Sequence, residues 1–319
     1  MKNKGIIIFL IVLAVVIVEV MVGDFISKRP DKMEANPYEY DIKDFKNVPE
    51  ELIHYKESKN FKIGFEEPTG ITIENEKIYL VGDKKLKIID LAGKLLNEIE
   101  LFDKPRTVEC SADKIYIAFE NQIQVLDETG KMIQEWIIPD ENSYITAISV
   151  YNGNVFIADA GTRKIMHFTL DGKKLNEFEG KISDEVLHGF IVPSPYFDID
   201  INEEGDLWVV NPGLHSFENY TFEGSLRSYW KSTSIKTEGF SGCCNPAHYT
   251  FLQDGSFVTS EKGMVRIKIY KPSGEFSGVV AAPNKFKDEG EAPDIAVDSQ
   301  GNIYALDFDR KVLRVFELK

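Results

Sequence analysis

The sequence predicts an all-β fold, a six-bladed β-propeller, preceded by one N-terminal transmembrane helix. Three observations support this prediction. A pattern of alternating β-strands recurs six times between Pro68 and the C-terminus, at a spacing of about forty residues. The segment Phe61 to Phe65 precedes the first repeat and belongs to none, whereas the last repeat ends after its third strand. An apolar run occupies Gly5 to Val22.

Each repeat shows the same order of expected strands: a first strand, a short turn, a second strand, a polar turn and a third strand. The second strands read KIYLVG, KIYIAF, NVFIAD, DLWVVN, SFVTSE and NIYALD, starting at Lys77, Lys114, Asn154, Asp206, Ser256 and Asn302. A turn with a glycine and a fourth, less regular strand follow in five of the six repeats. Four short strands per repeat are typical of a propeller. Because one such sheet cannot bury both of its faces, the six sheets must stack in a ring.

The two chain ends of the repeat region are expected to close this ring. The last repeat lacks a fourth strand, and Phe61 to Phe65 (FKIGF) can supply it. This pairing would leave no strand edge exposed. We therefore expect residues 1–23 to form an anchor, residues 24–60 a tether and residues 61–319 the propeller. A short helix is expected from Pro49, because proline suits a first helical turn.

The apolar run has the length of a membrane span. Its eighteen residues, Gly5 to Val22, would extend about 27 Å as a helix, close to the thickness of the hydrocarbon core of a bilayer. A cleaved signal peptide is the alternative, but its apolar region is usually shorter and ends in small residues. Glu19 to Asp24 (EVMVGD) lacks such a site. The sequence therefore favours an uncleaved anchor.

The distribution of charge along the chain bears on its membrane orientation and on its partners, and the cysteine content bears on structural sites. Basic residues flank the apolar run on both sides, so the positive-inside rule does not decide its orientation. A short tail before a large folded domain favours an exported, extracytoplasmic propeller. The net charge of −15 argues against a nucleic-acid partner and is compatible with cationic ligands or metal ions. Three cysteines without paired spacing do not predict a disulfide scaffold or a structural zinc site.

Two hairpins resemble NHL repeats. They are GNVFIADAGTRKIMHFTLDGK, which starts at Gly153, and GNIYALDFDRKVLRVF, which starts at Gly301. The resemblance extends over Pro68 to Lys319 and implies a six-bladed NHL-type propeller, a fold that serves mostly as a binding platform and sometimes as an enzyme. With its anchor and its Gly-Cys-Cys-Asn-Pro loop, the chain is also similar to membrane-anchored bacterial NHL-repeat proteins. More distantly, it is similar to gluconolactonase-like propellers.

One face of the ring is expected to carry the site. In an antiparallel blade, the loops that lead into first strands and those between second and third strands lie at the same edge. The longest of these loops are Gly180 to Ser194 and Lys231 to Pro246. Long loops on a rigid scaffold are common binding sites. The second of them leads into the least generic string of the chain, FSGCCNPAH, from Phe240 to His248.

The adjacent cysteines Cys243 and Cys244 allow three interpretations. Neighbouring Cα atoms lie only about 3.8 Å apart across a trans peptide, so a disulfide between them would be strained and comparatively easy to reduce. Such a bond could stiffen the loop. Alternatively, the thiols could bind a soft metal or perform redox chemistry, or could be ordinary packed and surface cysteines. Cys110 lies at an alternating apolar position and is expected in the core.

A second group of candidates comes from aligning the repeats on their apolar pairs. Asp198, His248 and Asp294 then occupy one position in three successive first strands, which line the central channel. Further polar residues end second strands on the same face. They are Asn211, Glu261, Asp159 and Asp307. These oxygen and nitrogen donors could hold a divalent cation, the candidate cofactor. Asp159 and Asp307 are instead expected to cap the turns that follow them.

Three functions remain open from the sequence. The first is a membrane-anchored platform that binds an unidentified ligand or protein through the face bearing Cys243 and Cys244. The second follows from the gluconolactonase-like resemblance, which implies a metal-dependent hydrolase of lactones or esters with a cation at the channel mouth. The third is a redox or metal-handling accessory protein. The motifs of phosphate loops, serine hydrolases and zinc proteases do not occur.

Overall fold

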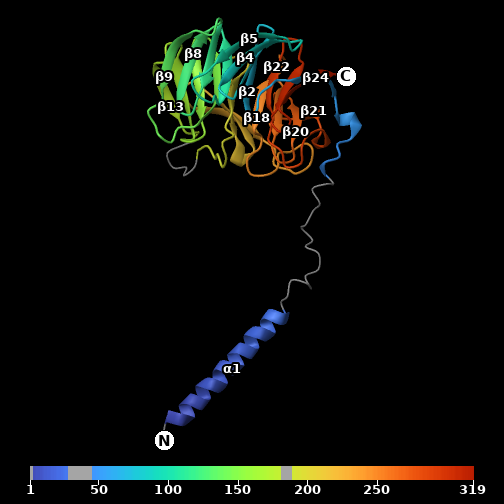
Figure 1. The fold of residues 1–319 in the computed structure, drawn as a ribbon. Coiled ribbons are helices and arrows are strands. Elements are labelled where there is room, and N and C mark those ends of the chain that lie inside the picture. Colours follow the sequence, from blue (N-terminus) through green and yellow to red (C-terminus); the bar gives the residue numbers. More distant parts are fainter. Residues whose placement is uncertain (1–2, 28–44, 181–188) are drawn as a thin grey trace. The chain divides into compact units, whose positions relative to one another are not determined.

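A computed structural model describes residues 3–27, 45–180 and 189–319 of the chain (Figure 1). The chain divides into two compact units, Met1–Asp44 and Phe45–Lys319. The first unit contains the helix α1 (Asn3–Ser27). Within it, Lys4–Asp24 is long and apolar enough to cross a membrane by length and composition. The expected N-terminal apolar helix is therefore confirmed, and it is consistent with membrane anchoring.

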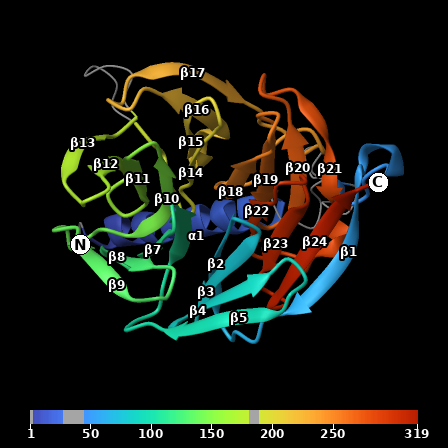
Figure 2. The same cartoon turned by 90° about the horizontal axis from the view of Figure 1, so that it is seen from above.

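The second unit consists of six antiparallel sheets of four strands each (Figure 2). The blades are blade 1, β2 (Pro68–Glu74), β3 (Lys77–Gly82), β4 (Lys85–Asp90) and β5 (Leu95–Glu100); blade 2, β6 (Thr107–Ser111), β7 (Lys114–Ala118), β8 (Gln122–Asp127) and β9 (Met132–Ile137); and blade 3, β10 (Ile145–Tyr151), β11 (Asn154–Asp159), β12 (Lys164–Thr169) and β13 (Lys174–Phe178).

Blade 4 contains β14 (Ile199–Ile201), β15 (Leu207–Asn211), β16 (Ser216–Tyr220) and β17 (Leu226–Lys231); blade 5 contains β18 (His248–Phe251), β19 (Phe257–Glu261), β20 (Arg266–Tyr270) and β21 (Phe276–Ala281); and blade 6 contains β22 (Asp294–Val297), β23 (Ile303–Asp307), β24 (Val312–Leu318) and β1 (Tyr55–Lys62). The short 3₁₀ turns are η3 (Glu50–Leu52), η4 (Pro212–Leu214) and η5 (Pro283–Lys285). Figure 2 shows the first strand of every blade facing the central axis. The predicted six-bladed propeller is confirmed.

The core of the propeller lies between the blades. Six clusters of buried apolar side chains are present, and each combines residues from two neighbouring blades. One of them packs Tyr79 and Val81 of blade 1 against Val108 and Cys110 of blade 2. Cys110 is therefore a core residue, as expected. Because every cluster needs both of its blades, no blade buries its apolar faces alone.

The closing strand is β1, which starts six residues before the expected segment Phe61 to Phe65. It pairs antiparallel with β24, from Tyr55 opposite Leu318 to Lys62 opposite Val312. Most of its side chains are exposed, because it is the outermost strand of blade 6. Its polar sequence YKESKNFK therefore lacks the apolar alternation that marks the inner strands.

Two apolar residues of the expected segment lie outside the closing strand and belong to the core. Ile63 and Phe65 follow β1 and are buried in the cluster between blades 6 and 1. The expected helix from Pro49 is likewise only the 3₁₀ turn η3, because the chain extends into β1 almost at once.

An ion pair secures this closure. The Arg314 guanidinium on β24 is almost fully buried and lies 2.7 Å from a carboxylate oxygen of Glu57 on β1. The same guanidinium lies 3.2 Å from Asp307 at the end of β23. Arg314 thus links the three outer strands of blade 6. Together with the hydrogen bonds of the β1–β24 ladder, it joins the two ends of the propeller.

Removal of β1 provides a test of the closure. A chain that starts at residue 63 keeps Ile63 and Phe65 but lacks β1, and we expect its unfolding midpoint to fall by on the order of 10 °C or more relative to a chain that starts at residue 45. Circular dichroism melts of the two chains measure the difference. Equal midpoints would show that β1 contributes nothing to the closure.

Candidate functional site

A pocket of about 250 Å³ lies at one end of the central channel. Its walls come from residues just before or at the start of the inner strands of all six blades, and from the turn after β23. The lining residues are Pro68, Thr69, Arg106, Thr107, Tyr144, Ile145, Thr146, Pro195, Tyr196, Phe197, Asp198, His248, Glu291, Asp294 and Phe308. The expected gathering of these loops on one face is thus observed. Residues 181–188 of the first long loop lie outside the described residues.

One position of the inner strands forms a ring around the channel. The six residues that share this position in the strand registers are Gly70, Thr107, Ala147, Asp198, His248 and Asp294. The three members from blades 1 to 3 are small, and the three from blades 4 to 6 are titratable. A Cβ atom on Gly70 would lie 3.0 Å from the Cα atom of Thr107, so β2 and β6 approach closely there.

The structure brings the three titratable members of this ring together. The Nδ1 atom of His248 lies 3.7 Å from Asp198 Oδ2 and 3.7 Å from Asp294 Oδ1. The Nε2 atom of His248 is buried and has no hydrogen-bond partner among the described residues. The ring of Tyr196 packs edge-on against the imidazole, with centroids 5.5 Å apart, and Phe308 lies at 6.4 Å. His248 is therefore an imidazole with one nitrogen near two carboxylates and the other buried without a hydrogen-bond partner among the described residues.

Backbone hydrogen bonds hold both carboxylates in place. Asp198 Oδ2 accepts from the amide of Tyr249 on the next blade, and Asp294 Oδ2 accepts from the amide of Ile71 on blade 1. Each carboxylate also accepts from the amide that follows it in its own strand. These aspartates therefore join neighbouring blades as well as flanking His248. Their rigid placement keeps the imidazole in one orientation.

The surroundings shift the pKa values of His248 and Asp294. Burial by itself would lower the pKa of His248, but the nearby carboxylates of Asp198 and Asp294 outweigh burial and raise this pKa above that of free histidine. Burial raises the pKa of Asp294 to about 6, although the charge of His248 opposes this effect. The group therefore exchanges protons near neutral pH.

A second cavity of about 180 Å³ lies along the channel, and Asp198 and Asp294 line it as well. Glu109 and Asp200 also face this cavity. Burial raises the pKa of Asp200 to about 7 and holds the pKa of Glu109 well above its usual range. Threonine and serine hydroxyls donate to both carboxylates. The channel next to the pocket is thus lined by acids that are protonated more easily than usual.

Asn211 and Glu261 do not line the pocket, in contrast to the expectation of shared ligands. Asn211 Oδ1 accepts from the amide of Ile191, and its amide group donates to Glu218. Glu261 pairs with Arg266 and Lys268 inside blade 5. Both residues end second strands, which lie one strand away from the axis. Their side chains therefore bind the blade itself rather than the channel.

Asp159 and Asp307 cap turns, as expected. Asp159 Oδ1 accepts from the amides of Gly161 and Thr162, and also from Tyr144 in the loop before β10. Asp307 Oδ1 accepts from the amide of Arg310. Asp159 and Asn211 thus share one function, because each ties the end of a second strand to the loop that leads into the inner strand of its blade.

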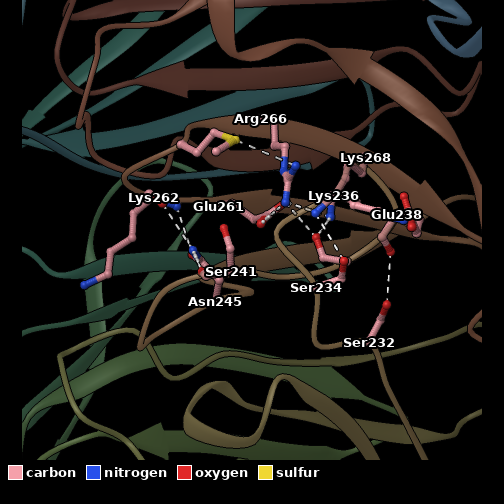
Figure 3. Close-up of polar contacts among 12 residues, drawn as sticks. Ser232, Ser234, Lys236, Glu238, Ser241, Asn245, Glu261, Lys262, Arg266 and Lys268 are labelled. Atoms are coloured by element: carbon pink, nitrogen blue, oxygen red, sulfur yellow. Dashed lines mark hydrogen bonds and ion pairs between the residues drawn. The ribbon is translucent and has the colours of Figure 1, made fainter. Parts of the chain in front are cut away.

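A buried charge cluster holds the base of the cysteine-containing loop (Figure 3). The Glu261 carboxylate lies 2.7 Å from Arg266 Nε and 2.8 Å from Lys268 Nζ, and all three side chains are fully buried. Arg266 and Lys268 both donate to the carbonyl oxygen of Gly239. Burial lowers the pKa of Lys268 to about 7, although Glu261 opposes this effect. The charged side chains of β19 and β20 therefore fix the loop between β17 and β18.

Cys243 and Cys244 lie in this loop as free thiols. Their sulfur atoms are 3.1 Å apart; Cys244 is buried and Cys243 is exposed. Next to them, Asn245 donates to the carbonyl oxygens of Ser241 and Lys262 and accepts from the amide of Lys262 (Figure 3). The residue Lys262 follows β19 and connects this loop to the pocket wall, because its ammonium group lies 5.0 Å from the centroid of the Tyr196 ring.

Several side chains of the pocket wall belong to no recognised motif. Arg106, Tyr144 and Tyr196 each come one to three residues before an inner strand. The Arg106 guanidinium lies 4.2 Å from the centroid of the Tyr144 ring and donates to the Tyr144 hydroxyl. Their position in the sequence could have identified them, since residues just before the inner strands of a propeller converge around the channel. A large side chain at such a position predicts a pocket residue in the same way as the aligned aspartates do.

The acidic, histidine and cysteine side chains described above do not form a metal site. Within residues 3–27, 45–180 and 189–319, no group of three or more histidine, cysteine and acidic side chains is arranged to hold a metal ion. The divalent cation suggested by the sequence thus has no ready ligand set in the described structure.

Comparison with solved structures shows the same fold. A streptogramin B lyase aligns with a TM-score of 0.61 and 17% identity over 85% of this chain and 100% of that chain. Virginiamycin B lyase from Staphylococcus aureus aligns at 0.57 and 18% over 83% and 100%. A calcium-binding protein, regucalcin, from Agrobacterium tumefaciens str. C58 aligns at 0.58 and 12% over 82% and 94%. No family model and no curated protein sequence matches the chain.

Titration of His248 tests the electrostatics of the pocket. We expect its pKa to lie above the ordinary value of about 6.5 and to fall in an Asp294→Asn variant, because one flanking carboxylate is lost. Because the pKa of His248 is raised, protonation of its ring contributes stability that is fully present below about pH 6.5 and is lost as the pH rises through the folded pKa, whereas the contact with Asp294 weakens once that carboxyl is protonated, near pH 6. NMR titration of labelled histidines measures the pKa. Asp113→Asn, at the exposed β6–β7 turn, is the control and should change nothing; a pKa below 6.5 would contradict the assignment.

The buried cluster predicts unequal effects of two substitutions. Glu261→Gln leaves Arg266 and Lys268 without a counter-charge, and we expect it to lower the free energy of unfolding by about 3 to 5 kcal/mol. Lys268→Met removes a cation that is readily neutralised, and we expect a loss below about 1 kcal/mol. Urea unfolding of both variants measures the difference. A larger loss for Lys268→Met would contradict this account of the charges.

Proposed function

We propose that the propeller binds a small ligand in the pocket at the channel mouth and that His248 Nε2 makes the central polar contact. One observation carries this proposal: His248 lines the pocket, and its buried Nε2 atom has no hydrogen-bond partner in the described part of the chain. Leaving such a nitrogen unpaired costs free energy, and a ligand that pairs with it recovers this cost. The first expectation from the sequence, a binding platform, is thus given a specific location.

The surroundings of His248 indicate the chemistry of the ligand. Its Nδ1 atom faces two carboxylates and therefore carries a proton. Because the carboxylates raise the pKa of His248, the doubly protonated ring, in which Nε2 donates a hydrogen bond, is favoured relative to a free histidine. The rings of Tyr196 and Phe308 pack against the imidazole ring. These features suit a ligand that offers a carbonyl or carboxylate oxygen and a flat, apolar body.

A second candidate function, proton transfer to or from the bound ligand, is favoured by the same imidazole. An imidazole that lines a pocket and whose Nδ1 atom lies beside carboxylates is typical of a general acid or base. A structurally similar virginiamycin B lyase is catalytically inactive when one histidine is replaced by alanine, and that variant was crystallised with quinupristin. Acid–base chemistry is therefore the catalytic alternative that this pocket supports best.

The helix α1 bears on where in the cell the propeller is located. We infer that it tethers the propeller to a membrane and that the propeller lies on the extracytoplasmic side. Its length and apolar composition support the first part. The second part follows the expectation from the sequence that the propeller is exported. The strong negative charge of the chain supports a ligand or protein partner rather than a nucleic acid.

A fragment screen tests the pocket. Small carbonyl compounds, including lactones and aromatic carboxylates, are screened by saturation-transfer NMR against the wild type and a His248→Phe variant. The substitution keeps a ring but removes both nitrogens, so we expect binding at the pocket to weaken by about tenfold or more. The matched control is His54→Gln, an exposed histidine, which should bind as the wild type does.

The same samples separate the two candidates. Unchanged fragments after long incubation indicate binding, whereas products that form with the wild type and not with His248→Phe indicate acid–base catalysis. Fragment binding that is equally strong in all three proteins would overturn the proposed role of His248.

A further inference from the structure

The loop that carries Cys243 and Cys244 is rigidly held on both sides of the two sulfur atoms. On one side, Arg266 and Lys268 donate to the carbonyl oxygen of Gly239 (Figure 3). On the other, Asn245 is bound to both the amide and the carbonyl group of Lys262. These bonds keep the two sulfurs as neighbours, at the observed 3.1 Å.

The two thiols differ in accessibility. Cys243 is exposed, so a reagent in solution can reach it, whereas Cys244 is buried. Burial raises the pKa of the Cys244 thiol, although hydrogen bonding by Ser194 and the charge of Lys262 oppose this effect. An exposed sulfur next to a protected one is the arrangement of an attacking and a resolving cysteine.

A chain of contacts leads from Cys244 to the pocket. The Ser194 side chain is among the groups that lower the pKa of the Cys244 thiol, and its hydroxyl oxygen accepts a hydrogen bond of 3.2 Å from Lys262 Nζ. The same ammonium group lies 5.0 Å from the centroid of the Tyr196 ring, which packs against the imidazole of His248. A change at the Cys244 sulfur therefore alters a partner of the pocket wall.

We propose that Cys243 and Cys244 form a reversible dithiol–disulfide pair whose redox state modifies the mouth pocket through Ser194, Lys262 and Tyr196. This inference deepens the proposed function and rests on it for the role of the pocket. The oxidant is a low-molecular-weight disulfide, and the reductant is the corresponding thiol.

The reaction proceeds by two thiol–disulfide exchanges. The Cys243 thiolate attacks the small disulfide; a bond forms between the two sulfurs, the bond within the small disulfide breaks, and one small thiolate leaves. The Cys244 sulfur, after losing its proton, then attacks Cys243 and releases the second small thiolate. The cysteine pair loses two electrons and two protons, and the small disulfide becomes two thiols. Because neighbouring Cα atoms lie closer together than in a relaxed disulfide, the bond is strained and easily reduced again.

The experiment uses the full chain in detergent micelles, equilibrated with oxidised or reduced glutathione. We expect the oxidised sample to lose two thiols per chain, with a peptide mass lower by two hydrogen atoms and without bound glutathione. We also expect the NMR signal of His248 to shift between the two states, with no ligand present. Reduced glutathione should reverse both changes.

Three variants make the test specific. Cys243→Ser removes the exposed sulfur and should abolish oxidation, whereas Cys110→Ser, in the core, should leave the oxidation of the pair unchanged. Ser194→Ala should still be oxidised but should no longer shift the His248 signal. Unreactive thiols in the native protein, a stable glutathione adduct on Cys243, or an identical His248 signal in both states would overturn the proposal. Because no ligand is used, a failed fragment screen would not produce any of these outcomes.

Discussion

Every sheet of this propeller has two apolar faces, and each face is buried only when another blade covers it. The six core clusters therefore lie between blades rather than within them. Because all six blades must pack together to bury their apolar faces, the stability of the core depends on a closed ring. The pairing of β1 with β24 therefore stabilises the whole propeller and not only the outer edge of blade 6. The charged contacts of Arg314 reinforce the position where the chain ends meet.

The same constraint creates the candidate site. Packing six blades around an axis brings equivalent residues of the inner strands close together, although about fifty residues separate them in the chain. Asp198 and Asp294 occupy two of these positions and bind amides of the following blades. Their carboxylates are thereby held beside His248. A contact that stabilises the ring thus also orients an imidazole and adjusts its protonation.

Blade 5 contains a fully buried group of charged side chains, and this group contacts the loop that carries the two cysteines. Glu261, Arg266 and Lys268 are fully buried and satisfy one another and the loop backbone. An apolar cluster of the same volume could pack as well, but it could not bind the carbonyl oxygen of Gly239. The buried charges therefore give the cysteine-containing loop a defined position next to the pocket.

The sequence by itself determined the repeat, the number of blades, the apolar helix and the alignment of Asp198, His248 and Asp294, because these depend on local alternation and on spacing along the chain. The tertiary structure decided which polar residues face the channel. From their sequence positions at the ends of second strands, Asn211 and Glu261 are expected at the channel. Their side chains instead bind groups of their own blades and of the loops attached to them. It also decided that the closing strand β1 extends back to Tyr55 and shares only Phe61 and Lys62 with the expected Phe61 to Phe65, since an outermost strand is held by backbone pairing and needs no apolar face. Contacts between residues distant in sequence, such as Lys262 over Tyr196, have no local signature and arise only when the blades are assembled.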